Sequence, residues 1–303
     1  MRWSAITLAF IAQAATATAQ ESRPAPVIKG YISSSAFVQS DAFGFGNGQS
    51  ALWVRPAAVG HTDRVTGADV RNSRITLHLP ESPLSDGLSA SGAVEIDFFG
   101  GFSGTSAFSD EQPLPRLRTA YADLTFGGTT LRVGQAFTPI FGNVPVSPSH
   151  LGYPLGLGSA GMIGFRHPGV YVSHAFPASG AGRRVTLHAA AFRGSWNGPG
   201  DNTDHGSAGE AAAVPQLEAR VDLAGSERGA TKWSLYLAGH YDEKNLLRDG
   251  TESVLTGRAV AGGGRVDHGR LTLHGNAYTG RAIGQQMGQL TQFGDIAGGG
   301  AWL

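Results

Sequence analysis

A two-residue alternation of polar and apolar side chains constrains the fold of this chain of 303 residues more than any other feature. From Arg74 to Leu79 the chain reads Arg, Ile, Thr, Leu, His, Leu, and similar runs return as far as Thr279, with Gly-rich gaps between them. Successive side chains of a β-strand point to opposite faces of the sheet. The pattern therefore predicts an all-β chain whose strands each carry one polar and one apolar face.

The composition agrees with this prediction and excludes several classes of protein. The 45 Gly and 15 Pro disfavour long helices, and the absence of Cys rules out disulfides and thiol catalysis. Charged residues make up only 15%, with 23 basic against 23 acidic side chains. This balance excludes a nucleic-acid binder driven by net positive charge, whereas a wall that faces lipid can be this poor in charge.

The connections between the expected strands alternate in length. Short ones such as Gly127-Gly128, which suits a two-residue hairpin, follow the even strands, and long ones such as Thr138 to Ala160 follow the odd strands. Outer-membrane barrels have this asymmetry of short periplasmic turns and long extracellular loops. The prediction is a transmembrane antiparallel up-and-down β-barrel with about a dozen strands visible. The expected strands are 27–40, 69–79, 89–99, 115–126, 129–137, 162–175, 183–196, 214–223, 231–241, 253–266, 271–279 and 296–303.

The N-terminal residues predict export. An apolar stretch from Trp3 to Ile11 precedes Ala17-Thr18-Ala19, which has the form of a signal peptidase site. The stretch is too short for a membrane anchor, which needs about 20 apolar residues. We expect a cleaved signal peptide at 1–19, a barrel domain at 20–303 and a location in the bacterial outer membrane.

Polar side chains that share one strand face are the candidate lining of a water-filled interior. In the first half of the chain this face carries His78, Glu95 and Asp97 together with several arginines. An arginine on such a wall could simply pair with an acid on the next strand, which would be a structural role. Alternatively, paired arginines and acids would create a transverse field at the narrowest point, and uncompensated arginines would concentrate anions there.

The block from Asp69 to Val144 contains four informative strings: Asn72-Ser73-Arg74, Gly92-Ala93-Val94-Glu95-Ile96-Asp97-Phe98-Phe99-Gly100, Arg116-Leu117-Arg118-Thr119-Ala120-Tyr121 and Gly134-Gln135-Ala136-Phe137-Thr138-Pro139. In these strings and their order, the block resembles the porin family that includes the DcaP-type trimeric porins. The resemblance implies a homotrimer of water-filled barrels that pass small anionic, dicarboxylate-like solutes, with arginines at the constriction. Carried over by position, these arginines are Arg74, Arg116, Arg118 and Arg132. It also implies more strands than the dozen counted, about 16 in a complete chain, so we expect the last strands to be missing; closure of the barrel with a dozen strands is the alternative.

The expected function is passive diffusion through an outer-membrane porin, without catalytic residues, metal or cofactor. Its partners would be outer-membrane lipid, small anionic solutes and two further copies of the chain, and no nucleic acid. Either Thr138 to Ala160 or Gly100 to Pro113 is expected to fold inward and narrow the pore. Two alternatives stay open: a barrel enzyme of the lipase or protease type, which needs a Ser-His pair near the outer rim, and a secreted β-rich binding protein, which would be soluble without detergent.

Overall fold

A computed structural model describes residues 24–40, 43–44, 53–54, 64–101, 113–144, 161–177, 182–194, 208–227, 231–248 and 251–287. The predicted signal peptide at 1–19 and the expected strand at 296–303 lie outside these residues. Within the described part, no helix is long and apolar enough to cross a membrane.

The described strands form one antiparallel sheet of 11 strands whose order follows the chain, β1-β6-β7-β8-β9-β10-β11-β12-β13-β14-β15. The all-β, up-and-down prediction is confirmed, and every expected strand before residue 280 is present. The strands are β1 (Val27–Tyr31), β6 (Arg74–Ser85), β7 (Leu88–Asp97), β8 (Arg116–Phe126), β9 (Thr129–Phe137), β10 (Arg166–Ala175), β11 (Arg184–Phe192), β12 (Gln216–Glu227), β13 (Thr231–Arg248), β14 (Thr251–His268) and β15 (Leu271–Arg281).

Smaller elements extend the sheet at one end. The pair β2 (Ser35–Gln39) and β5 (Val65–Asp69) prolongs the β1–β6 pairing, and β3 (Phe43–Gly44) pairs with β4 (Trp53–Val54). Two short helices, α1 (Ala208–Ala211) and the 3-10 helix η2 (Gly284–Met287), complete the described elements.

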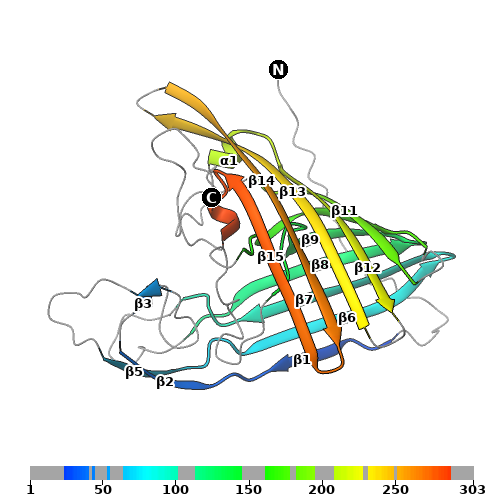
Figure 1. The fold of residues 1–303 in the computed structure, drawn as a ribbon, viewed down its shortest axis with the longest axis horizontal. Helices are drawn as coiled ribbons and strands as arrows, with labels where there is room; N and C mark the ends of the chain where they lie inside the picture. Colours follow the sequence, from blue (N-terminus) through cyan, green and yellow to red (C-terminus); the bar gives the residue numbers. More distant parts are fainter. Residues whose placement is uncertain are drawn as a thin grey trace, which may run out of the picture.

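The sheet is strongly curved, so that β6–β9 and β13–β15 face each other across the molecule (Figure 1). Strands β6, β8, β10, β12 and β14 each end, and the next strand begins, at one end of the sheet; the longer connections after β7, β9 and β11 and the two-residue connection after β13 leave from the other end. We call these the short-turn end and the long-loop end. The sorting of connection lengths expected from the sequence therefore holds after β7, β9 and β11 but not after β13, and at those three places it matches the long extracellular loops of an outer-membrane barrel.

Several expected strand bounds were wrong. The strand expected at 27–40 is two strands, β1 and β2, the one expected at 69–79 begins only at Arg74, and two strands end later than expected. Strand β6 does not stop at Pro80 but continues to Ser85. Its prolines are accommodated because the pairing with β7 shifts register at two places in this stretch, and Pro is tolerated in a strand at bulges. The loop expected after Tyr241 is also mostly strand, because β13 and β14 pair as far as Arg248 with Thr251.

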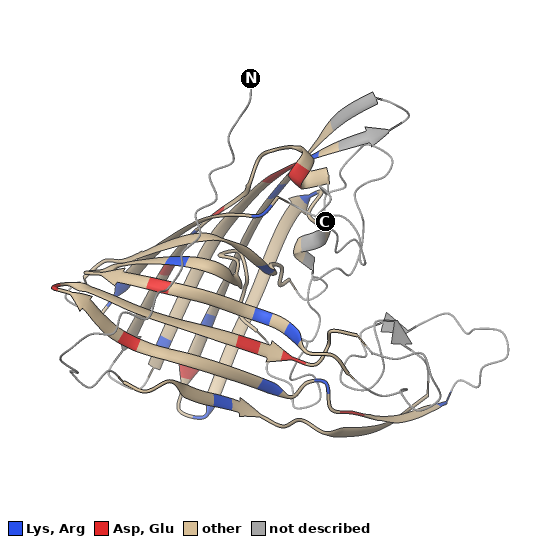
Figure 2. Ribbon diagram, turned by 180° about the vertical axis from the view of Figure 1, so that it is seen from behind, with Lys and Arg blue, Asp and Glu red and all other residues tan. Residues whose placement is uncertain are grey.

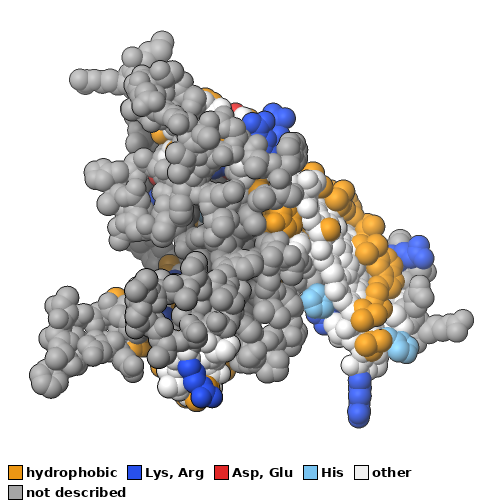
Figure 3. Space-filling model, turned by 60° about the vertical axis from the view of Figure 1, so that its left-hand side comes forward, with side chains coloured by type: hydrophobic (Ala, Val, Ile, Leu, Met, Phe, Trp, Pro, Cys, Tyr) orange, Lys and Arg blue, Asp and Glu red, His pale blue; other side chains and the backbone are white. Residues whose placement is uncertain are grey.

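Burial in this sheet is the reverse of burial in a soluble protein. Leu77, Leu117 and Leu237 keep 37%, 48% and 56% of their surface exposed, whereas Asp97 and Glu218 keep 1% and 4%. Hydrophobic side chains form a band over the outer surface of the strands in Figure 3, and most basic side chains there lie at its margins. Charged residues are almost never fully buried in a soluble fold unless they are paired. The apolar outer wall and polar inner wall indicate that the strands are solvated by lipid outside and water inside.

Candidate functional site

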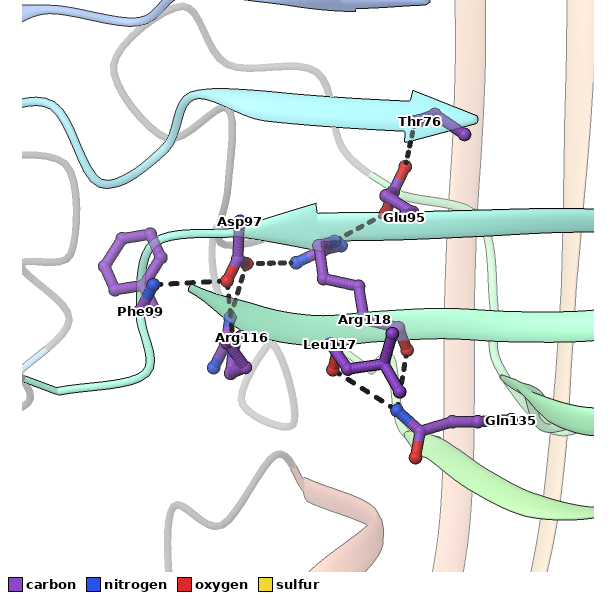
Figure 4. A network of polar contacts seen from close by, with 8 residues as sticks. All are labelled: Thr76, Glu95, Asp97, Phe99, Arg116, Leu117, Arg118 and Gln135. Atoms are coloured by element: carbon purple, nitrogen blue, oxygen red, sulfur yellow. Dashed lines mark hydrogen bonds and ion pairs between the residues drawn. The ribbon is translucent and has the colours of Figure 1, made fainter. Parts of the chain in front are cut away.

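A network of ion pairs joins β6, β7 and β8 near the long-loop end (Figure 4). Asp97 accepts hydrogen bonds from Arg116 at 2.6 and 3.0 Å and from Arg118 at 2.9 Å. Arg118 Nε also donates to Glu95 Oε1 at 2.5 Å, and Thr76 Oγ1 donates to Glu95 Oε2 at 3.3 Å. Two carboxylates therefore share two guanidinium groups, an arrangement that fixes the arginine planes against the wall.

A β-bulge in β8 makes this network possible. Glu95 of β7 pairs with Thr119, but the next residue, Ile96, pairs with Leu117, so Arg118 is the extra residue. Arg118 and Thr119 are consequently both buried, although they are neighbours, while Leu117 points outward. Bulges re-aim side chains in this way. The bulge is further held by Gln135 of β9, whose Nε2 donates to the Arg118 carbonyl at 2.9 Å.

Arg74 and His78 lie beside this network on the same face of β6 as Thr76. The guanidinium of Arg74 lies over the ring of Tyr31 at 5.7 Å, and its buried Nε has no hydrogen-bond partner among the described residues. Arg74 also makes no ion pair within the described part of the chain. His78 faces Ala93 of β7 in the register and is partly buried.

Arg132 of β9 takes part in a separate ion pair, closer to the short-turn end of the strands. Its guanidinium donates to both carboxylate oxygens of Asp123 at 2.7 and 2.8 Å and lies over the Tyr121 ring at 3.6 Å. A bidentate pair stacked on an aromatic ring is a geometry that Lys could not reproduce. Arg132, Tyr171, Ser173 and His188 line a cavity of about 220 Å³ at this depth.

Strands β11, β12 and β13 hold a second set of charges. On β12, Asp222 pairs with Arg220 at 2.7 Å and with His188 of β11 at 2.9 Å. Further toward the long-loop end, a buried charge ladder runs along β12 and β13. Its members are Glu218, His240, Asp242 and Lys244, whose side chains keep at most 7% exposure. Its closest contacts are Glu218 to His240 at 2.9 Å and Asp242 to Lys244 at 2.7 Å.

Chain that follows β9 folds inward and contacts β12 at the Glu218 end of the ladder, while at the other end Lys244 Nζ donates to the Ala282 carbonyl, after β15, at 2.9 Å. The Ile140 amide donates to Glu218 Oε2 at 2.7 Å, and Arg220 Nη1 donates to the carbonyls of Pro139 and Phe141 at 3.1 and 2.8 Å. The residues 138–144 and 161–165 are the two described stems of the connection between β9 and β10. Of the two connections expected to fold inward, the stems of the first do so; most of the second, from 102 to 112, lies outside the described residues.

The structure brings four of the seven candidate residues into one network: Glu95, Asp97, Arg116 and Arg118. Arg74 and His78 adjoin it, and Arg132 belongs to a different pair. The acid that fixes Arg132, Asp123, was missed, as was the role of the ladder. Asp123 sits in a run, Tyr-Ala-Asp-Leu-Thr, where the expected alternation could have placed it on the inner face.

Comparisons with known proteins identify the fold. No family model matches the sequence, and no curated protein matches it. Among solved structures, the outer membrane channel DcaP of Acinetobacter baumannii is similar to 85% of this chain with a TM-score of 0.55 and 17% identity. OmpT, an outer membrane protein of Vibrio cholerae, is similar over 84% of this chain and 64% of its own, with a TM-score of 0.42 and 12% identity. An anion-selective porin from Comamonas acidovorans is similar over 84% of this chain and 78% of its own, with a TM-score of 0.35 and 14% identity.

The class that the fold defines is the outer-membrane β-barrel of the porin type. Within that class the recognised similarity is to DcaP, as the resemblance of residues 69–144 implied. The chain spans 64% of the length of DcaP, which is less than two thirds.

Proposed function

We propose that this chain forms a water-filled channel of the bacterial outer membrane, through which small hydrophilic solutes diffuse down their gradients. The inverted burial of the sheet carries this proposal. A wall with Leu and Val outside and ion pairs inside is stable only where lipid surrounds it and water reaches its interior. The similarity to an outer membrane channel supports the same assignment.

We further propose a preference for anions such as small dicarboxylates. Counted with the adjoining Arg74, the network of β6–β8 has three arginines, Arg74, Arg116 and Arg118, against two acids, Glu95 and Asp97. Within the described residues, its net charge is therefore positive by one, and the unpaired arginine is Arg74. A positive charge in a narrow, low-dielectric passage raises the local concentration of anions.

The remaining parts of the proposal concern assembly and chemistry. The exported chain would sit in the outer membrane as a homotrimer and act without cofactor or energy coupling, not as an enzyme. A barrel enzyme would need a Ser-His pair at the outer rim. Two hydroxyl–histidine contacts in the described strands, Thr129 with His174 at 2.8 Å and Thr231 with His268 at 2.7 Å, lie instead at the short-turn end.

The test is to record the purified, folded protein in a planar bilayer under a KCl gradient. Stepwise openings with a reversal potential of the anion-selective sign would support both parts of the proposal. Openings with a cation-selective potential would overturn the solute preference alone. A silent bilayer from folded protein would overturn the channel and favour the barrel enzyme.

A further inference from the structure

Asn276, in the middle of β15, contacts the inward-folded chain through both ends of its side-chain amide. Its Oδ1 accepts a hydrogen bond from the Asn143 amide at 2.8 Å, and its Nδ2 donates to the Asn143 carbonyl at 2.8 Å. The side chain thus takes the place of a neighbouring strand for one residue. Because the two residues are 133 positions apart, this is a contact between the loop stem and the opposite wall.

Residues of β13 and β14 leave room for the Asn276 amide and bind it. Tyr236 of β13 also donates to Asn276 Oδ1, at 2.9 Å, by reaching across β14. It can do so because Gly263, which pairs with both residues in the register, has no side chain. A Cβ at Gly263 would lie 2.6 Å from the Tyr236 ring and 2.7 Å from Asn276 Oδ1.

Both stems of the loop meet at the same place through glycines. A Cβ at Gly142 would lie 2.6 Å from Tyr236 Oη and 2.7 Å from Asn276 Oδ1. A Cβ at Gly161, in the second stem, would collide with the Asn276 carbonyl, and Gly161 has a positive φ of 81°. The close approach of both stems to β15 therefore requires glycine at these two positions.

An apolar cluster beside the amide provides the packing. Ile140 of the first stem and Ile163 of the second are 0% and 1% exposed. They pack against the inner face of β13 and β14 with Tyr236, Ala238, Ala259, Ala261 and Ile283. Small alanines on this inner face leave the space that the two isoleucines fill. Apolar packing alone is not directional, so the hydrogen bonds of Asn276 define where the stem lies along the wall.

We propose that Asn276 is the positioning residue of the inward loop and thereby sets the solute-size limit of the pore. The inference rests on the proposed channel function. Asn276 need not touch the solute. It holds the stems of the loop against β13–β15, on the far side from the ion-pair network of β6–β8, and so keeps the passage along that network at a fixed width.

The first experiment is liposome swelling with uncharged sugars of increasing size. In the Asn276→Leu variant, of similar volume but without hydrogen bonds, we expect larger sugars to enter, with the reversal potential in KCl unchanged. Asn276→Asp keeps the acceptor but loses the donor and should lie between wild type and Asn276→Leu. Gly142→Ala should reproduce the effect from the other side of the contact.

The matched control is His274→Gln, on the same face of β15. The Nδ1 atom of His274 has no hydrogen-bond partner among the described residues, and this variant should keep the wild-type size limit. Unchanged size limits in folded Asn276→Leu and Gly142→Ala would overturn the proposal. A size limit that moves equally in His274→Gln would also overturn it, because the effect would then not depend on the loop.

A second readout does not depend on channel activity. The chain has no Cys, so the Ile140→Cys and Ala238→Cys pair can report by disulfide formation whether the stem sits on β13. We expect the cross-link to form in the otherwise wild-type chain and several-fold more slowly with Asn276→Leu. Equal rates would contradict the positioning role. If wild type forms no pore, the proposed function fails, and this cross-link still decides what Asn276 does.

Discussion

Ion pairs line both walls of the barrel, β6–β9 and β12–β13, but they differ in how much of their surface is exposed. On β6–β9 most ion pairs keep one accessible partner: Glu95, Arg116 and Arg132 keep between 22% and 34% of their side-chain surface, whereas Asp97 and Arg118 keep 2% and 7%. On β12–β13 the charge ladder contacts the inward stem at Glu218, and Glu218 and His240 keep 0%. Figure 2 shows that charged residues recur along the strands of both walls.

This difference separates two roles for buried charge in a barrel. An ion pair in contact with water can act on a passing ion through its field. A buried ion pair without access to water cannot act on a passing ion. Removing one of its partners nevertheless lowers the stability strongly, because the other charge stays buried without a counter-charge. In the proposed channel, we therefore expect the solute path to run along β6–β9, and we expect the ladder of β12–β13 to hold the loop stems that narrow this path.

Removing one carboxylate from each wall should change the free energy of unfolding by very different amounts. Glu218→Ala removes the acceptor of both Ile140 and His240 and should cost about 3–5 kcal/mol. Glu95→Ala, on the accessible wall, leaves Arg118 paired with Asp97 and should cost about 1 kcal/mol or less. Urea unfolding in lipid vesicles, followed by tryptophan fluorescence, measures both. Similar losses in the two variants would mean that the walls do not differ in the way described.

A second comparison tests depth along the outer surface. Leu237 lies mid-strand on β13 and is 56% exposed, as is Leu271 beside the short turn before β15. If lipid surrounds the sheet, Leu237→Arg should cost about 2–4 kcal/mol and Leu271→Arg about 0–1 kcal/mol. The same unfolding assay decides. Costs near zero at both positions would indicate that water, not lipid, contacts this face.

The third expected effect is on ion selectivity. Substituting Arg74, Arg116 and Arg118 together with Ser leaves Glu95 and Asp97 on the accessible wall, so the reversal potential in a KCl gradient should move to the cation-selective sign. Lys244→Gln removes a cation from the buried ladder and serves as the control, with no change in reversal potential. An unchanged potential in the triple variant would remove these arginines from the account of selectivity.

The smallest expected effect is the dependence of selectivity on salt. The Debye length falls from about 10 Å at 0.1 M to about 3 Å at 1 M. Over this range the anion preference of the wild type should weaken, and the cation preference of the triple variant should weaken as well. Selectivity that does not change with salt would indicate a steric rather than electrostatic origin.

Local alternation was enough to predict the strands, their faces and the long connections after β7, β9 and β11, because these depend on neighbours in sequence. It could not predict the bulge at Arg118, since the extra residue is defined only by its pairing with β7. The polar run after Tyr241 read as a loop, whereas Asp242 and Lys244 satisfy each other two residues apart on one strand face. The hydrogen bond between the loop stem and β12 could not be predicted either, because Ile140 and Glu218 are 78 positions apart in the sequence.

Two cysteine variants at neighbouring positions of β6 test directly whether the polar face of the sheet contacts water and the apolar face contacts lipid. Thr76 bonds to the Glu95 carboxylate on the inner face, and Leu77 points outward. In a bilayer, a charged, membrane-impermeant thiol reagent should react with the Thr76→Cys variant and reduce its conductance, and should leave the Leu77→Cys variant unchanged. Reaction at position 77 with protection at position 76 would contradict the account.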